Sequence, residues 1–230
     1  VDGAVFTHVS NVFGYILPVK EMAAECRAAG VPFVLDAAQS AGSLPVDFGA
    51  LGAEFIAMPG HKGLLGPQGT GLLLCGDPGK PLLFGGTGTL SREKTMPEDL
   101  PERLEAGTVN VPGAAGLAAG IRLVRSLTPE KIFARGHGQT MACGRALEEM
   151  GYRVFTGPHQ AMTLSFQGKA DCEEIAEALG SRGVAVRAGL HCAPLAHESA
   201  GTLEKGTVRI SFGHDASPAQ TNALLRALGV

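Results

Sequence analysis

The sequence lacks the features that mark nucleic-acid-binding, membrane or secreted proteins. Its 230 residues carry a formal net charge of -3, and no run of like charges is long enough to gather phosphate groups or a membrane surface. No stretch of about 20 consecutive apolar residues is present, and the N-terminus has no basic region followed by an apolar one. We therefore expect no nucleic-acid partner, no membrane span and no secretion signal.

Cysteine is sparse and irregularly spaced. The five cysteines are an odd number without a Cys-x-x-Cys pair, so neither a disulfide framework nor a four-thiolate zinc site is indicated. This usage is typical of a reducing compartment, and we predict a cytoplasmic protein without a metal site. With 45% hydrophobic and 18% charged residues, the chain is expected to be globular and to bury one or two cores.

The first part of the chain predicts a parallel sheet. Residues 4–9 and 31–36 have the β-branched, apolar composition of short strands. Between them, Pro18 and Gly30 are typical of the start and the stop of a helix. A strand, helix, strand order at this spacing requires a crossover, and hence parallel strands. Because the chain begins without methionine and directly on a strand, we expect it to be a fragment of a longer protein.

The middle of the chain predicts two more strands and an irregular excursion. Residues 54–58 and 70–75 continue the sheet and bracket a glycine-rich loop. Residues 76–111 are rich in glycine, proline, threonine and charge and have little periodicity. Irregular segments of this length usually have a function, so we expect one here.

The second half predicts two helices and then a separate small α+β unit. The helices occupy residues 114–127 and 129–150, and the second is opened by Thr128 as its cap with Pro129 at its first position. The later elements are predicted as strand 153–155, strand 161–166, helix 172–182, strand 184–186, a loop, strand 207–212 and helix 218–228. We place the domain boundary near residue 126, giving units of residues 1–126 and 127–230.

The glycine-rich loop is the most informative segment, because Gly60-His61-Lys62 places one lysine beside a histidine. Pyridoxal phosphate needs a lysine for covalent attachment, an acid facing its pyridine nitrogen and donors for its phosphate. Asp36 falls at the carboxyl end of a predicted strand, where open α/β sheets bind ligands, and Gln39 follows one short turn later. These residues predict one pyridoxal phosphate pocket.

Each candidate residue also has an ordinary structural explanation. Lys62 alone suits a solvated loop, and Asp36 alone suits a cap on the turn after its strand. Arg209 lies in the middle of a predicted strand, where a charge usually faces solvent. Cys192 alone suits a buried structural thiol, which is the role that we expect for the other four cysteines.

Two other kinds of site are disfavoured. A zinc site of His191, Cys192 and His197 has no evident fourth ligand, and its spacing matches no standard site. The glycines at residues 76–80 and 86–88 lack the spacing and the helix context of a nucleotide-binding loop.

In their order along the chain, the motifs resemble the fold type I pyridoxal phosphate enzymes of aminotransferase class V, and within it the cysteine desulfurases and selenocysteine lyases. The matching blocks are Thr7-His8-Val9-Ser10-Asn11, Asp36-Ala37-Ala38-Gln39, Gly60-His61-Lys62, Glu105-Ala106-Gly107-Thr108, Arg187-Ala188-Gly189-Leu190-His191-Cys192-Ala193 and Val208-Arg209-Ile210-Ser211. The resemblance implies an α/β fold, with part of the large-domain sheet of the pyridoxal phosphate transferases followed by a small C-terminal α+β domain.

The resemblance implies a cofactor role for several matching residues. Lys62 would bond pyridoxal phosphate covalently, Asp36 would face its pyridine nitrogen and Gln39 its ring hydroxyl. His61 would donate to the phosphate, and Asn11 would lie against the ring or the substrate. The family's ring-stacking residue and first phosphate-binding turn would lie upstream of residue 1, so we expect the 230-residue chain to bind the cofactor weakly or not at all.

Further roles implied by the resemblance concern the substrate and a second subunit. Arg209 would hold the substrate carboxylate, for which the planar guanidinium fork is suited. Gly107 and Thr108 would reach the cofactor phosphate of the neighbouring subunit, which implies a homodimer with shared sites. Pro59 stands where relatives commonly carry Ser or Thr as a phosphate donor, so that hydrogen bond is absent or comes from another residue.

Cys192 distinguishes the reactions open to this family. A desulfurase needs a thiolate that attacks the substrate sulfur, and positive charge from His191 or Arg187 would favour that thiolate. We therefore expect conversion of cysteine to alanine with an enzyme persulfide, followed by transfer to a sulfur-acceptor protein, or the same reaction on selenocysteine. A class V aminotransferase or another lyase, in which Cys192 is incidental, is one alternative. A non-catalytic scaffold with this fold is the other.

Overall fold

The first sheet carries the strand, helix, strand unit predicted from the sequence. In the computed structural model, which describes residues 1–88, 90 and 92–229, its strands lie in the order β1 (Ala4–Thr7), β2 (Phe33–Asp36), β3 (Phe55–Pro59) and β4 (Gly71–Cys75). The first three strands are parallel and β4 is antiparallel to β3. The parallel pairing of β1 with β2 confirms the predicted crossover unit.

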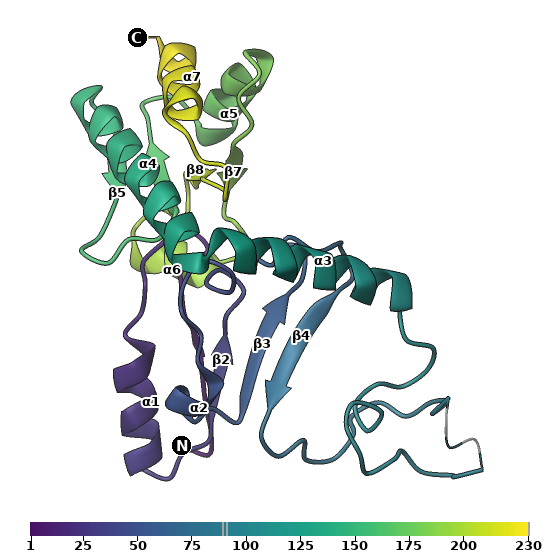
Figure 1. Cartoon of the computed structure of the whole chain (residues 1–230). Helices are drawn as coiled ribbons and strands as arrows, with labels where there is room; N and C mark the ends of the chain where they lie inside the picture. The colour runs from purple at the N-terminus through teal and green to yellow at the C-terminus, as the bar shows by residue number, and fades with distance from the viewer. Residues whose placement is uncertain (89, 91, 230) are drawn as a thin grey trace.

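Three helices accompany this sheet, namely α1 (Val19–Ala28), α2 (Phe48–Leu51) and α3 (Val111–Leu127) (Figure 1). Leu35 of β2 and Ile56 of β3 are fully buried at the centre of its core. The predicted stop of the first helix is confirmed, because Gly30 takes the left-handed φ of 65° that ends α1. The described residues between β4 and α3 form neither helix nor strand, as predicted, and they project to one side of the sheet (Figure 1).

The second sheet is antiparallel throughout and has two different faces. Its strands lie in the order β5 (Arg153–Phe155), β6 (Thr163–Gln167), β8 (Thr207–Ser211) and β7 (Arg187–Gly189). Alternate residues such as Phe166 and Val208 are fully buried in the core that this sheet forms with α4 (Pro129–Glu149), α5 (Cys172–Ser181) and α7 (Pro218–Leu228). The intervening residues, among them Ser165 and Arg209, give the opposite face its polar character.

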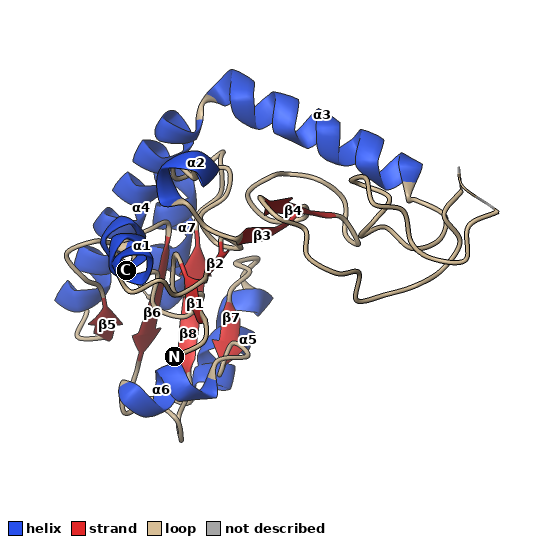
Figure 2. Cartoon of the chain, turned by 90° about the horizontal axis from the view of Figure 1, so that it is seen from below, coloured by secondary structure: helices blue, strands red, loops and turns tan. Residues whose placement is uncertain are grey.

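The segment that follows β1 lies against this polar face and joins the two sheets. The Ser165 hydroxyl donates to the Val12 carbonyl at 2.6 Å, and the Gln160 amide donates to the Phe13 carbonyl at 2.7 Å. The Arg209 guanidinium of β8 donates to the Asn11 carbonyl of this segment at 2.9 Å, and Figure 2 views the two sheets from below. The joint brings the carboxyl end of the first sheet next to the polar face of the second, and the candidate site lies there.

The break between α3 and α4 falls at Thr128, just after the predicted domain boundary near residue 126. Thr128 occupies the predicted N-cap position of α4, but with a φ of 64° its side chain makes no capping hydrogen bond. Pro129 does occupy the start of α4. The division into residues 1–126 and 127–230 stays a prediction. None of the helices that the structure describes is long and apolar enough to cross a membrane.

Two elements of the second half differ from their prediction. Residues 184–186 do not form a strand, because Val184 and Val186 pack against the core without strand pairing, and pairing with β8 begins only at Arg187. The expected loop after it contains the short helix α6 (Pro194–Ser199). By contrast, β5 and α7 match their predicted residues.

Candidate active site

The loop between β3 and β4 carries His61 and Lys62, and its glycines are required by close packing. A Cβ atom on Gly42 would lie 2.1 Å from the Gly63 carbonyl oxygen, and one on Gly63 would lie 2.2 Å from the Ala41 carbonyl oxygen. Only glycine permits this approach of the loop to the turn that follows β2. The lysine loop is therefore fixed next to the end of the strand that carries Asp36.

Helix α3 holds the same loop from another side. A Cβ atom on Gly120 would lie 2.4 Å from the Leu64 carbonyl oxygen, so the helix also needs glycine at its contact with the loop. Leu64 points into the core of the first sheet, while His61 and Lys62 are exposed. The backbone of the loop thus contacts two elements closely, and the His61 and Lys62 side chains face outward.

Lys62 and Gln39 line one cavity of about 200 Å³ between the two sheets. Its wall is completed by Thr163 and Ser211 of the second sheet and by Met162 and His214 beside its strands, among others. Within the described residues, no hydrogen bond or ion pair involves the Lys62 or the Gln39 side chain. The cavity therefore presents an amine and an amide without protein partners, and this donor chemistry is compatible with a polar small molecule.

Two other predicted cofactor residues do not line this cavity. The exposed Asp36 carboxylate accepts a hydrogen bond from the Ala38 backbone N–H at 2.8 Å, so the ordinary turn-capping role does occur. That bond uses one carboxylate oxygen, and the structure describes no protein partner for the other. His61 is also exposed, and its ring makes no described hydrogen bond. Their cofactor roles stay predictions.

Gly107 and Thr108 lie far along the irregular excursion. They line a separate cavity of about 380 Å³ with Gly86, Glu105 and others, and the Gly107 N–H donates to the Gly86 carbonyl at 2.8 Å. Figure 1 shows this excursion on the side of the first sheet away from the second. Within one chain these residues are therefore not brought to the lysine loop, and their contact with a neighbouring subunit's cofactor stays a prediction.

Cys192 belongs to a second group of side chains, beside the polar face of the second sheet. Its thiol is exposed, and the Arg187 guanidinium donates to its Sγ at 3.6 Å. The Asn11 amide donates to the carbonyl of His191 at 2.7 Å, and Arg209 in turn donates to the Asn11 carbonyl at 2.9 Å. The exposure shows that Cys192 is not a buried structural thiol.

Arg187 and Arg209 face one another across β7 and β8. Burial, and then the charge of Arg187, lower the pKa of Arg209 from its usual value. The Nε of Arg209 is buried and has no hydrogen-bond partner within the described residues, so this arginine does not simply face solvent. No described carboxylate lies within ion-pair distance of either guanidinium. Two uncompensated cations on one face are suited to an anionic ligand.

His191 does not supply the positive charge that the sequence suggested. Its side chain is 3% exposed, and burial, followed by the charge of Arg209, lowers its pKa to about 4. The imidazole is therefore neutral near pH 7, and Arg187 is the cation that contacts the thiol. Within the described residues, no group of three His, Cys, Asp or Glu side chains is placed to hold a metal ion.

The backbone at this thiol is in an uncommon conformation. His191 and Cys192 have φ values of 52° and 59°, in the left-handed region, although neither is glycine. Such residues cost about 1–3 kcal/mol each and persist only where the surroundings hold them. Surrounding contacts must therefore hold this turn in place.

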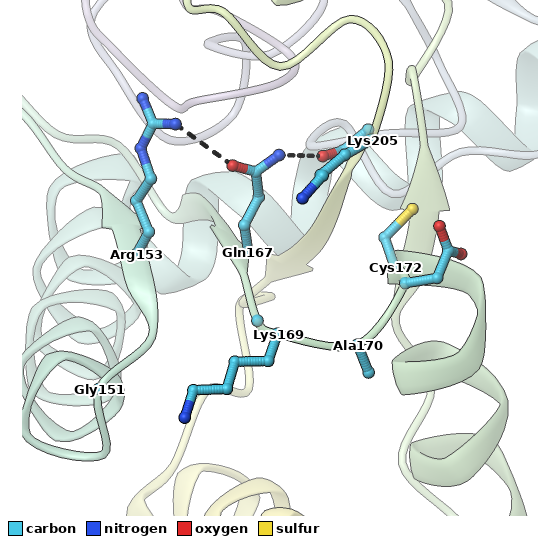
Figure 3. Close-up of a pocket in the computed structure, with 10 residues that line it drawn as sticks. Gly151, Arg153, Gln167, Lys169, Ala170, Cys172 and Lys205 are labelled. Atoms are coloured by element: carbon cyan, nitrogen blue, oxygen red, sulfur yellow. Dashed lines mark hydrogen bonds between the residues drawn. The ribbon is translucent and has the colours of Figure 1, made fainter.

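A larger cavity of about 360 Å³ lies elsewhere in the second unit (Figure 3). It is lined by Arg153, Gln167, Lys205 and Cys172, with other residues, and Arg153 donates to the Gln167 side chain at 3.4 Å. Burial, and less strongly the nearby carboxylates, raise the pKa of the Cys172 thiol. Cys172 therefore stays in the protonated thiol form, which is unreactive. None of the predicted site residues lines this cavity.

Sequence reasoning did not single out Thr163 and Ser211, which line the cavity at Lys62. Both lie on the polar face of the second sheet, opposite one another in the β6 and β8 pairing. The alternation of polar and apolar residues in each strand was the available signal, since it places Ser211 on the same face as Arg209.

The comparisons with known proteins agree with this fold. A family model described as aminotransferase class-V matches residues 3–224. The chain belongs to this family. It is 36% identical over 213 residues to a probable cysteine desulfurase of Methanothermobacter thermautotrophicus, and the match covers 86% of this chain and 53% of that protein. It is 37% identical over 218 residues to a probable cysteine desulfurase of Pyrococcus abyssi, covering 89% of this chain and 53% of that protein.

Solved structures of cysteine desulfurases have the same fold. The apo structure of a cysteine desulfurase from Thermococcus onnurineus superimposes with a TM-score of 0.88 at 32% identity, covering 99% of this chain and 59% of that one. The Escherichia coli cysteine desulfurase CsdA gives a TM-score of 0.87 at 27% identity, with 97% and 57% coverage. The pyridoxal phosphate transferase-like fold is thereby confirmed. The chain spans about half the length of the two probable cysteine desulfurases that it matches.

Proposed function

We propose that the protein is a pyridoxal phosphate-dependent cysteine desulfurase that converts L-cysteine to L-alanine and leaves a persulfide on Cys192. One observation carries this proposal. An exposed thiol lies against the Arg187 guanidinium, which itself stands opposite Arg209 on the polar face of the second sheet. Desulfuration needs a nucleophilic thiol next to a carboxylate-binding cation, whereas amino transfer needs no thiol.

The residues of the first sheet suit the cofactor by their donor chemistry. Pyridoxal phosphate, when bound, supplies the electron sink for cleavage of the substrate's carbon–sulfur bond. Lys62 would bond it covalently, Asp36 and Gln39 would bind its ring nitrogen and ring hydroxyl, and His61 would donate to its phosphate. The partnerless Lys62 and Gln39 side chains in one cavity support these assignments.

The residues of the second sheet would bind the substrate and take its sulfur. Arg209 would donate to the substrate carboxylate, and Arg187 would stabilise the Cys192 thiolate by its positive charge. The thiolate would attack the substrate sulfur, so that a sulfur–sulfur bond forms as the carbon–sulfur bond breaks. The electron pair of the broken bond stays with the substrate carbon, which takes a proton to become the methyl group of alanine.

Other features of the proposal concern partners. The substrate is a small amino acid, cysteine or selenocysteine, and the persulfide would pass to a sulfur-acceptor protein in the cytoplasm. A homodimer with shared sites accounts for the placement of Gly107 and Thr108 away from the lysine loop of their own chain.

The test measures alanine and sulfide released from L-cysteine by the protein with excess pyridoxal phosphate and a thiol reductant. We expect Cys192→Ala to abolish sulfide release and Cys75→Ala, which changes a half-buried cysteine of β4, to retain it. Sulfide release at the wild-type rate by Cys192→Ala would refute the mechanism. Transfer of the amino group to a keto acid, without sulfide, would favour the class V aminotransferase.

A further inference from the structure

The turn that carries Cys192 is held by the neighbouring buried histidine. His191 is anchored through its backbone and its ring. Its carbonyl accepts the 2.7 Å hydrogen bond from the Asn11 amide, and its Nε2 lies 3.1 Å from both the carbonyl and the hydroxyl oxygen of Thr207. Its ring also lies against that of His197, with 5.6 Å between the ring centroids. These contacts reach the β1 segment, β8 and α6 at once.

The surroundings of the ring select one protonation state. The Thr207 carbonyl can only accept a hydrogen bond, so Nε2 must carry the hydrogen. Placing the hydrogen on Nδ1 instead would set a nitrogen lone pair against that carbonyl and leave a buried donor without a partner within the described residues. The doubly protonated form is opposed by burial and by the positive charges of Arg209 and Arg187.

We infer that His191 is a positioning residue for Cys192. As a neutral imidazole that donates from Nε2 to the Thr207 carbonyl, it holds the left-handed turn in the conformation that places the thiol at the Arg187 guanidinium. His191 does not exchange a proton with the thiol in this assignment. The inference rests on the proposed role of Cys192, but its test uses the thiol's own reactivity and needs neither cofactor nor substrate.

The test measures the alkylation rate of Cys192 by iodoacetamide at pH 7, with each labelled cysteine quantified by mass spectrometry. His191→Gln keeps a donor near the position of Nε2, whereas the shorter His191→Asn does not reach it. Once the turn is released from Arg187, the guanidinium no longer contacts the thiol, and the rate at pH 7 should fall roughly three- to ten-fold in His191→Asn. The rate of His191→Gln should stay within about two-fold of the wild type, because thiolate fraction sets the rate.

Two further variants separate positioning from a general loss of structure. Arg187→Gln should lower the alkylation rate by itself, and adding His191→Asn to it should cause little further change, because both act through one contact. Thr207→Val keeps the carbonyl acceptor and should leave the rate unchanged. Half-buried Cys75 in the same samples reports any general loosening of the fold.

The inference is overturned if His191→Asn retains the wild-type alkylation rate, if His191→Gln lowers the rate as far as His191→Asn does, or if the effects of Arg187→Gln and His191→Asn multiply fully in the double variant. A fall in rate in Thr207→Val as large as that in His191→Asn would overturn the assigned tautomer. If His191→Asn does not fold, the alkylation rates of His191→Gln and Thr207→Val still decide, since a marked fall in either contradicts the assignment. The desulfurase activity of Cys192→Ala tests the proposed function separately, because none of these alkylation outcomes depends on it.

Discussion

The lysine loop and the Cys192 turn are held in place by opposite means. At the lysine loop the backbone is fixed by glycine contacts with the turn after β2 and with α3, while the Lys62 and Gln39 side chains have no described protein partner. At the Cys192 turn, side chains from three parts of the chain bind one another and the backbone. The difference indicates that the first region keeps its side chains available for a small molecule, whereas the second must hold one thiol in a fixed place.

The comparison predicts that a substitution at the lysine loop can remove activity without lowering the stability of the fold. Lys62→Ala should lower desulfurase activity by at least about 10³-fold, because loss of a covalent catalytic group has effects of this order or larger. Its unfolding free energy should change by less than about 0.5 kcal/mol, since the side chain is exposed. Steady-state kinetics and urea unfolding give the two quantities, with Lys20→Ala on α1 as the control. A marked loss of stability in Lys62→Ala would contradict the comparison.

The glycine contacts predict a stability effect at the lysine loop that depends on position. Gly42→Ala should destabilise the protein by about 3 kcal/mol, from steric overlap with the Gly63 carbonyl together with a left-handed φ of 88°. Gly69→Ala has a similar φ of 75° but no atom near its Cβ, so about 1 kcal/mol is expected. Urea unfolding of both variants isolates the effect of the Gly42–Gly63 contact. Equal losses of unfolding free energy in the two variants would show that this contact does not contribute to stability.

The buried histidines predict an acid sensitivity that originates mainly in the second region. His191 has a pKa lowered from 6.5 to about 4, and burial also lowers the pKa of His8 and His197. The unfolded chain therefore binds more protons below pH 6.5, and stability should fall as the pH drops from about 6.5 towards 4. The His191 share is about 2 kcal/mol at pH 5.

Urea midpoints measured from pH 7 to pH 5 check this acid sensitivity. The loss should be smaller in His191→Gln, which keeps the hydrogen bond and removes the titrating group. A profile identical to the wild type would mean that His191 does not resist protonation in the folded protein. His159→Gln, at a histidine whose ring makes no described hydrogen bond, serves as the matched control.

The smallest predicted effect concerns the substrate side of the second region. Arg209→Lys keeps the positive charge but loses the planar fork, so the KM for cysteine should rise about ten-fold with little change in kcat. Arg153→Lys, on the same sheet but outside the site, should retain the wild-type KM. Initial-rate kinetics decide, and an unchanged KM in Arg209→Lys would argue against its contact with the carboxylate.

Much of the fold followed from local patterns, and the exceptions have physical reasons. Helix α7 was predicted to the residue because a proline start and a glycine stop frame an amphipathic run. Residues 184–186 were predicted as a strand because their composition is β-branched, but these side chains are satisfied by packing against the core without backbone pairing. Strand pairing is a long-range property, and local composition does not determine where it begins.

The site was predicted less completely. The ordered motifs indicated the residues, but the sequence suggested that His191 could be charged, and it left open that Cys192 was a buried structural thiol. In the structure His191 is buried and neutral near pH 7, and Cys192 is exposed. Adjacent residues of a left-handed turn can point into entirely different surroundings, and no pattern in the sequence reports this.

By itself, the sequence determined the class of fold, the glycines of the lysine loop and the residue types available for chemistry, because these depend on local conformation and on ordered motifs. Only the tertiary structure decided which residues meet. It brought Lys62 and Gln39 into one cavity and placed Cys192 at Arg187, while Gly107 and Thr108 stayed on the far excursion. The physical reason is the separation along the chain. The lysine loop carries Lys62, but the cavity around this side chain is completed by strands more than a hundred residues later, and contacts over that separation are determined by packing.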